Sequence, residues 1–254
     1  MLFSPPKIDC HCHIFDPDAF PYQADTPYRP AGAEIATARY FTALHQAYGV
    51  GHALLVGPNS GYGTDNRCML DAIAQGQGRY KGIAVLPNPT STAELRQLQT
   101  QGIVGVAFNF ALQGLGAYAD ADPLFKRLAD LDMFVQVQVQ NDQMAALAPR
   151  LVASGARVLV DHHGRPDVNA GLNAPGFQAL LRLADSGRCF VKLSGHDKFT
   201  QRPYPFEDAA PYTQALLNAF GPAHCLWGSD WPLILPLIYG HLSKRHWPAR
   251  TALG

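Results

Sequence analysis

The chain has 254 residues; 47% are apolar and 16% are charged, with 20 Lys and Arg residues against 20 Asp and Glu residues. The length suits one α/β barrel with a large core. The balanced charge argues against a nucleic-acid partner, and no segment has the ~18 uncharged apolar residues of a membrane span. We find no signal peptide, and the five cysteines are an odd number. We therefore expect a cytoplasmic protein with reduced thiols.

The first strand is predicted at residues 8–15, which read IDCHCHIF. Alternate side chains of a strand share a face, so His11 and His13 should point the same way, with Asp9 and Phe15 in step. The intervening cysteines should face the other way and act as small buried hydrophobic residues. Two adjacent imidazoles at a strand end suit a metal, a substrate carbonyl or a water. The alternative is one core histidine and one surface histidine.

A proline-rich loop over residues 16–30 follows this strand, and we expect it to be a functional lid. Beyond the loop, short apolar runs alternate with helical patterns. Strands are predicted at residues 8–15, 52–56, 82–86, 104–110, 133–140, 157–163, 189–194 and 225–231. Helices are predicted at residues 34–48, 66–75, 92–99, 123–131, 142–153, 177–184 and 211–220.

Strands that alternate with helices indicate a parallel sheet, and eight such units indicate an α/β fold, a (β/α)8 TIM-type barrel in a single domain over residues 1–254. No Gly-x-Gly-x-x-Gly follows the first strand, which argues against a dinucleotide-binding fold. After the eighth strand, Pro236, Gly240 and Pro248 break any long helix. We therefore expect a distorted barrel with an atypical or missing last helix and an irregular tail over residues 233–254. A second copy of the chain could cover the resulting apolar seam, giving a homodimer.

The active site of such a barrel lies at the C-terminal ends of its strands. Several residues that carry chemistry are expected there. They are His11 and His13 from strand one, Asp161, His162, His163 and Arg165 from strand six, Lys192, Ser194, His196 and Lys198 from strand seven, and Ser229, Asp230 and Trp231 from strand eight. The convergence of several histidines and one aspartate on one barrel mouth is more specific than any single motif.

Five segments carry a resemblance to a known family. They are residues 9–15 (DCHCHIF), 63–66 (GTDN), 105–110 (GVAFNF), 161–167 (DHHGRPD) and 227–232 (WGSDWP). In this order they resemble the amidohydrolase superfamily, and within it the branch of 2-pyrone-4,6-dicarboxylate lactonases and sugar lactonases. The resemblance covers nearly the whole chain up to Pro232. It implies a distorted (β/α)8 barrel that hydrolyses a lactone, the cyclic ester of a carboxylic or sugar acid.

The resemblance also implies roles for individual residues. Asp230 matches the general base that activates water, since a carboxylate is ionised at neutral pH and can accept a proton from water. His11, His13 and His162 match the histidines that polarise the lactone carbonyl. Arg165 matches an arginine that would hold a substrate carboxylate with its planar fork. The alternative for this arginine is an ion pair with a nearby aspartate.

The metal ligands that binuclear members of the superfamily use, a lysine after strand four and a histidine after strand five, are missing from this sequence. A bridged two-metal site is therefore not expected. The lactonase branch is thought to work without a divalent metal, so we expect that no cofactor is required. The alternative is one Zn²⁺ on His11, His13 and Asp230, which would make the chain a mononuclear zinc-dependent hydrolase or decarboxylase of the same superfamily.

The substrate pocket departs from that of the dicarboxylate lactonase. Ala107 and Gln113 stand where that enzyme has arginines, so we expect a less charged small molecule, a sugar lactone or a monocarboxylate lactone. Other residues could line the pocket; these are Tyr62, Ser60, Asn109, Gln138 and Lys198. The lost arginines and the unusual tail also leave open a non-catalytic ligand-binding barrel. The intact set of three histidines and one aspartate argues against that alternative.

Overall fold

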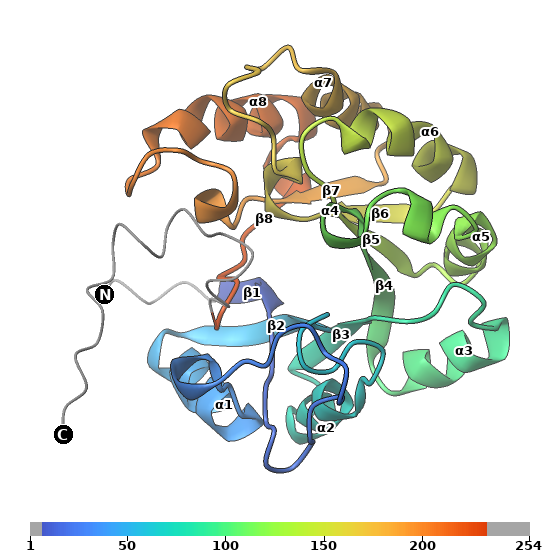
Figure 1. Cartoon of the computed structure of the whole chain (residues 1–254), viewed down its shortest axis with the longest axis vertical. Coiled ribbons are helices and arrows are strands. Elements are labelled where there is room, and N and C mark those ends of the chain that lie inside the picture. Colours follow the sequence, from blue (N-terminus) through green and yellow to red (C-terminus); the bar gives the residue numbers. More distant parts are fainter. Residues whose placement is uncertain (1–6, 233–254) are drawn as a thin grey trace.

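The computed structural model describes residues 7–232 as an eight-stranded parallel barrel with helices around it (Figure 1). Neighbouring strands follow the order of the sequence. The strands are β1 (Lys7–Cys12), β2 (Val50–Val56), β3 (Tyr80–Ala84), β4 (Ile103–Asn109), β5 (Phe134–Gln138), β6 (Arg157–Val160), β7 (Cys189–Lys192) and β8 (Cys225–Leu226). The helices are α1 (Ala38–Ala47), α2 (Arg67–Gln75), α3 (Thr92–Thr100), α4 (Phe110–Gln113), α5 (Asp122–Asp130), α6 (Gln143–Ser154), α7 (Pro175–Arg182) and α8 (Ala210–Phe220).

Successive side chains of β5 point alternately into the hydrophobic core and into the barrel interior. Val135 and Val137 are buried in the core, whereas Gln136 and Gln138 line a pocket at the barrel mouth. This is the period of two residues expected of a strand. Large side chains of the helices, such as the fully buried Phe125 of α5, complete the core. Burial of one such side chain contributes about 1.5–3 kcal/mol to folding.

Helix boundaries follow local capping chemistry. Ser91 and Glu94 form a capping box at the start of α3, in which each side chain accepts a hydrogen bond from the other residue's backbone N–H. Thr37 caps α1 in a similar way, so the helix begins at Ala38 and not at residue 34 as predicted. The sequence analysis also misses the single turn of α4, which is too short to show a helical period.

The barrel closes irregularly between β1 and β8. The two-residue strand β8 is followed by a connection that runs beside β1. Cys10 N donates to Trp227 O at 3.0 Å, and His13 N donates to Trp231 O at 2.8 Å. An isolated parallel bridge joins Cys12 to Trp231. The predicted distorted (β/α)8 barrel is thus confirmed within the described part of the chain.

Only β2 ends where the sequence predicts; the other seven strands end early, and β1, β6 and β8 fall short by the most, three to five residues. Positive φ angles redirect the chain after two of them, with φ 50° at His162 and φ 58° at Asp230, conformations outside the β region. His13 likewise follows the end of β1. These three side chains therefore lie on connections just past strand ends, at the rim of the barrel.

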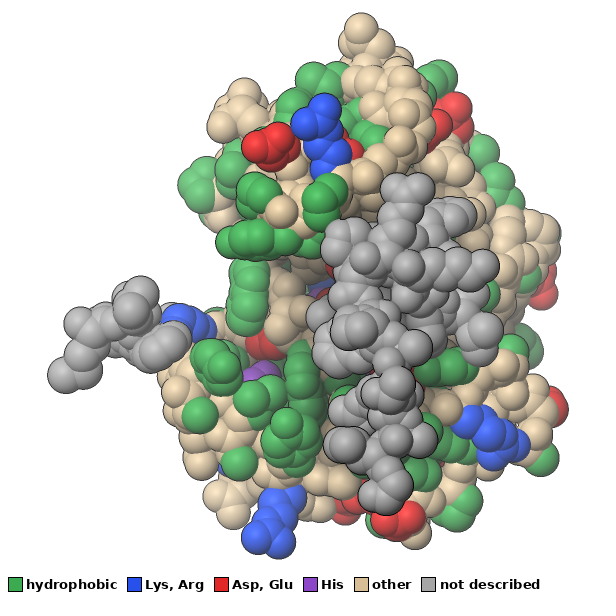
Figure 2. All heavy atoms as spheres, turned by 60° about the vertical axis from the view of Figure 1, so that its left-hand side comes forward, with side chains coloured by type: hydrophobic (Ala, Val, Ile, Leu, Met, Phe, Trp, Pro, Cys, Tyr) green, Lys and Arg blue, Asp and Glu red, His purple; other side chains and the backbone are tan. Residues whose placement is uncertain are grey.

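The predicted tail over residues 233–254, its missing helix and the seam for a second copy lie outside the described residues. No helix within residues 7–232 is long and apolar enough to cross a membrane. All five cysteines are free thiols, and Cys12, Cys68 and Cys189 are buried. On the face drawn in Figure 2, the Lys and Arg side chains of the described residues stand apart from one another.

Candidate active site

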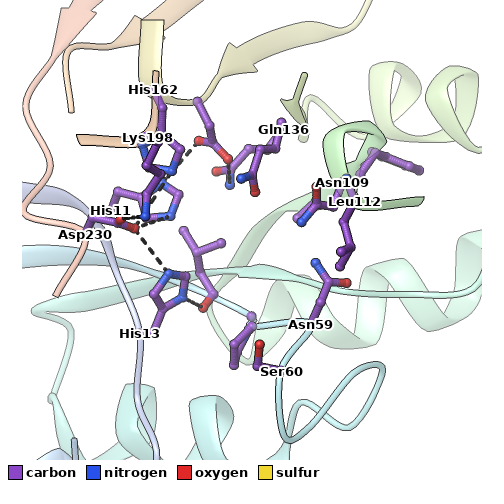
Figure 3. Close-up of a pocket in the computed structure, with 17 residues that line it drawn as sticks. His11, His13, Asn59, Ser60, Asn109, Leu112, Gln136, His162, Lys198 and Asp230 are labelled. Carbon is purple, nitrogen blue, oxygen red and sulfur yellow. Dashed lines mark hydrogen bonds and ion pairs between the residues drawn. The ribbon is translucent and has the colours of Figure 1, made fainter. Parts of the chain in front are cut away.

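A polar pocket at the C-terminal ends of the strands holds most of the predicted site (Figure 3). The pocket is partly open to solvent, and most of the side chains that line it are polar. The predicted residues that line it are Asp230, His11, His13, Asp161, His162, Lys198, Ser60, Asn109 and Gln138. The structure thus brings the four predicted catalytic residues together, while their roles stay predictions.

Asp230 lies at the centre of the polar cluster. Its Oδ1 is 3.5 Å from His11 Nε2, 3.5 Å from His13 Nε2 and 3.8 Å from His162 Nε2. Its Oδ2 is 2.6 Å from Nζ of Lys198. The carboxylate is therefore surrounded by three imidazoles and one ammonium group.

Burial disfavours the charged form of Asp230, but its neighbours reverse this effect. Contacts with His162 and Lys198 and a hydrogen bond with His13 hold the pKa of Asp230 well below its usual range. Burial also lowers the pKa values of His11 and His162. At neutral pH the pocket therefore holds an ionised carboxylate beside two neutral imidazoles.

The junction between β8 and β1 positions Asp230. The connection after β8 needs a glycine at Gly228, because a Cβ there would lie 2.6 Å from the Cβ of His11. Ser229 donates its N–H and its hydroxyl to the carboxylate of Asp9, and the N–H of Asp230 donates to His11 O at 2.7 Å. An aspartate tolerates the left-handed φ that Asp230 adopts. These bonds fix the Asp230 backbone against β1.

Asp9 does not join the two histidines in the pocket, although strand alternation predicts that it should. In addition to its bonds with Ser229, its carboxylate accepts a hydrogen bond from His11 N at 3.1 Å and lies 3.6 Å from Nε2 of His45. The register of β1 against β2 shifts between Asp9 and Cys12. Such an irregularity redirects side chains, so the period of two fails at this point.

A fully buried polar layer lies behind His11. Lys192 Nζ is 3.1 Å from His11 Nδ1, 3.0 Å from Asp161 Oδ1 and 2.8 Å from Gln136 Oε1. Gln136 Nε2 in turn donates to Asp161 Oδ2 at 2.9 Å. Burial opposes ionisation of Asp161, but Lys192 and His11 hold its pKa far below its usual range. The sequence analysis misses Gln136, although a polar residue among the valines of β5 was a usable signal.

The other two histidines have different anchors. His13 Nδ1 donates to the carbonyl of Val56 at 2.8 Å, which leaves Nε2 toward Asp230. His162 Nδ1 lies 3.0 Å from Ser194 Oγ. These contacts through Nδ1 fix both rings with Nε2 in the pocket.

The wall opposite Asp230 is neutral. Figure 3 shows Asn59, Ser60, Asn109 and Leu112 across the pocket from the histidines. Asn109 Oδ1 accepts a hydrogen bond from Leu112 N at 3.0 Å, which caps α4. Asn59 and Leu112 were not predicted, and their only signal is a place just after β2 and β4, in a loop and in the short helix α4.

Two predicted substrate-binding residues lie outside this lining. Arg165 is buried and has a left-handed φ of 45°, and its carbonyl accepts a hydrogen bond from Asn141 N. The ring of Tyr62 stacks on Phe15, and its hydroxyl accepts a hydrogen bond from Asp16 N at 3.0 Å. Neither side chain is among the described residues that line the pocket. The pocket therefore gives no support for a substrate contact by either residue.

One metal ion would fit the cluster by position. The ligand atoms of His11, His13 and Asp230 lie within 4.8 Å of one another. Two histidines and one carboxylate are a ligand set that catalytic zinc sites use, with the fourth position left for water or substrate. The predicted alternative of one Zn²⁺ therefore has the positions it needs.

Comparisons with known proteins identify the family of the chain. The family model described as Amidohydrolase matches residues 8–246. A 4-sulfomuconolactone hydrolase of Rhizobium radiobacter is 32% identical over 229 residues, which are 88% of this chain and 75% of that protein. A 2-pyrone-4,6-dicarboxylate hydrolase of Comamonas testosteroni is 31% identical over 238 residues, covering 89% of this chain and 76% of that protein. A crystal structure from Acinetobacter baumannii, a probable 2-pyrone-4,6-dicarboxylic acid hydrolase with citric acid bound, has a TM-score of 0.80 and 31% identity over 93% of this chain and 86% of that chain.

Proposed function

The chain belongs to the amidohydrolase family, and from this premise we propose that it opens a lactone by attack of a water that Asp230 activates. The observation that carries the proposal is one ionised carboxylate whose Oδ1 lies within 3.8 Å of three imidazole nitrogens in a pocket for a small molecule. Ester hydrolysis requires a base for the water and donors for the carbonyl oxygen. The names of the lactone-hydrolysing relatives support the same class of reaction.

In the first step, Asp230 accepts a proton from water while the water oxygen bonds to the lactone carbonyl carbon. The carbonyl π electrons move to the carbonyl oxygen, and His11 and His162 donate hydrogen bonds to the resulting oxyanion. A donor of this kind lowers the barrier by about 3–4 kcal/mol in a well-studied hydrolase. His13 donates its Nδ1 proton to Val56 O, so its Nε2 points toward Asp230 and the same water.

In the second step, the oxyanion reforms the carbonyl and the bond between the carbonyl carbon and the ring oxygen breaks. The protonated carboxyl of Asp230 returns its proton to the leaving ring oxygen. The product is the open-chain hydroxy acid or its keto form, and Asp230 is again ionised. No proton or electron is left over, so the cycle needs only water and the lactone.

The pocket favours a lactone with few charges. Lys198 is the only lysine or arginine among the described residues that line it, and the opposite wall is made of amides, a hydroxyl and a leucine. Ala107 lines the pocket where the dicarboxylate lactonase is expected to have an arginine, whereas Gln113 does not reach it. We therefore place sugar lactones and lactones with one acidic group ahead of a pyrone dicarboxylate.

A zinc-dependent hydrolase is the second candidate, because three suitable ligand atoms lie close together. One Zn²⁺ held by His11, His13 and Asp230 would supply a Lewis acid for the carbonyl oxygen. The two candidates differ in their response to a chelator.

The test is a panel of sugar lactones, muconolactones and pyrone carboxylates assayed by acid release, with and without chelator. Under the metal-free proposal turnover survives chelation, and Asp230→Asn lowers kcat by about 10²–10⁴-fold. Asp130→Asn, on the exposed face of α5, is the matched control and keeps full activity. Turnover that chelation abolishes and zinc restores would favour the second candidate. Equal lactone binding by both forms without any turnover would instead favour a ligand-binding barrel.

A further inference from the structure

Lys192 is fully buried behind the pocket, and no step of the proposed reaction uses it directly. We infer that Lys192 is a positioning residue that fixes the ring proton of His11 on Nε2, so that His11 faces the pocket as a hydrogen-bond donor and not as a metal ligand. The inference rests on the proposed lactone hydrolysis for the carbonyl oxygen that His11 would contact. The hydrogen-bond network that supports it is independent of the substrate.

The three protons of the Lys192 ammonium have three partners. A lysine ammonium has three donors and no acceptor. Its Nζ lies 2.8 Å from Gln136 Oε1, 3.0 Å from Asp161 Oδ1 and 3.1 Å from His11 Nδ1. All three donors are satisfied only if His11 Nδ1 is an acceptor. A neutral imidazole with an acceptor at Nδ1 carries its proton on Nε2.

The competing arrangement places the proton on His11 Nδ1 and directs it to Asp161 Oδ1, 3.2 Å away. One Lys192 proton would then face an N–H group although Lys192 is fully buried, and a buried donor without an acceptor is costly. Asp161 does not need the extra donor, because Gln136 and Lys192 already donate to its two oxygens. The full count of donors and acceptors therefore favours the proton on Nε2.

His13 has the opposite arrangement. Its Nδ1 lies 2.8 Å from Val56 O, and a carbonyl oxygen can only accept, so Nδ1 carries the proton. Its Nε2 lies 3.5 Å from Asp230 Oδ1. The two histidines of the His-x-His pair thus differ at Nδ1, which carries a proton in His13 and accepts a hydrogen bond in His11.

This difference conflicts with metal binding through both rings. A metal needs the lone pair of Nε2 from His11 and from His13 to use the cluster of three ligand atoms. His11 can supply that lone pair only if its proton moves to Nδ1 and the hydrogen bond from Lys192 is lost. The positions fit a zinc ion, but the proton on His11 does not.

The first experiment measures the tautomers in the wild-type protein. Long-range ¹H–¹⁵N spectra of protein with ¹⁵N-labelled histidine distinguish protonated from unprotonated ring nitrogens, and His11→Gln and His13→Gln spectra assign the signals. We expect His11 with Nε2 protonated and Nδ1 unprotonated, and His13 with Nδ1 protonated. A protonated Nδ1 in His11 would overturn the inference.

The second experiment measures the zinc affinity of the Lys192→Met protein by competition with a chromophoric chelator. Without the ammonium, His11 Nδ1 can donate to Asp161 and Nε2 becomes a ligand, so we expect Zn²⁺ to bind about 10- to 100-fold more tightly than to wild type. Lys126→Met, the same change at an exposed lysine of α5, should keep the wild-type affinity. An unchanged zinc affinity in folded Lys192→Met would overturn the inference. If that variant does not fold, the wild-type spectra decide.

Neither readout depends on turnover. If no lactone of the panel is hydrolysed but the tautomers are the expected ones, the proposed function is refuted and the role of Lys192 stands. If wild-type His11 carries its proton on Nδ1, the inference is refuted even if the protein hydrolyses lactones.

Discussion

Replacement of Lys198 by methionine tests the electrostatics of the proposed base. Lys198 Nζ lies 2.6 Å from Asp230 Oδ2, and both side chains are more than nine-tenths buried. Two unit charges at that distance interact by about 6 kcal/mol at an effective dielectric constant of 20, which is a ceiling for the pair. Opposite charges at short range usually shift a carboxyl pKa by about 1–3 units. We therefore expect the pKa of Asp230 to rise by about that amount in Lys198→Met.

The assay is the pH dependence of kcat/KM for a neutral lactone from the active panel. Asp230 works as a base only when ionised, so activity falls as the pH drops through its pKa. That pKa is held well below the usual carboxyl range in wild type, and the acid limb should therefore lie at low pH. In Lys198→Met the limb should move to higher pH by about 1–3 units. A neutral lactone excludes any loss that comes from binding a substrate carboxylate.

If Lys198→Met folds and is active but its acid limb stays at the wild-type pH, the limb does not report the pKa of an Asp230 that the Lys198 ammonium stabilises. That result would refute the assignment. Lys126→Met is the control for removal of one positive charge elsewhere on the surface, where Lys126 pairs with Asp130. It should leave the limb in place, since exposed charges are screened within about 10 Å at 0.1 M salt.

Two further predictions concern packing and stability. Gly195 and Gly155 both have a left-handed φ, but only the Cβ at Gly195 would meet a side chain of the proposed catalytic set, at 2.5 Å from His162 Nδ1. Gly195→Ala should therefore lower kcat as well as stability, whereas Gly155→Ala should cost only about 1 kcal/mol of unfolding free energy, measured by urea titration. Burial, helped by His196, lowers the pKa of His163 to about 3. The unfolded chain then binds a proton below about pH 6.5 that native His163 rejects, so His163 alone should lower the unfolding free energy by about 1.4 kcal/mol per pH unit from there toward pH 3. His163→Gln should reduce the measured slope by that amount, and an equal slope in both proteins would contradict the buried neutral imidazole.

The fold could be predicted because apolar residues recur along the sequence with the spacings of strands and helices. Eight apolar runs separated by helical patterns have few solutions other than a barrel, and small errors at element ends do not change the topology. The largest errors are at β1, β6 and β8, whose ends precede His13, His162 and Asp230, and the chain leaves the β region at the last two. Local propensity does not encode these departures, because they depend on tertiary bonds such as those from Ser229 to Asp9.

The residues of the site were predictable to different degrees. His11, His13, His162 and Asp230 stand at strand ends, so topology alone brings them to one rim. The contact between Lys192 and His11 joins positions 181 residues apart, and only the barrel closure determines which strand-seven side chain reaches which histidine. Tertiary packing likewise keeps Arg165 and Tyr62 out of the pocket lining, which no sequence pattern reveals.

The low pKa of Asp230 also constrains the substrate of the proposed reaction. A carboxylate stabilised by an ammonium and imidazoles is a weak base, and a weak base gives less help in removing a proton from water. Such a base suits an electrophilic carbonyl and a stable leaving group better than it suits an amide. A lactone whose ring oxygen leaves as an enolate has both properties. Of the two classes that the pocket charge favours, an enol lactone with one acidic group therefore ranks ahead of a sugar lactone, whose ring oxygen leaves as an aliphatic hydroxyl. A substrate carboxylate beside Lys198 would add a further effect, because it would draw the ammonium from Asp230 and raise the pKa of the base only when the substrate is bound.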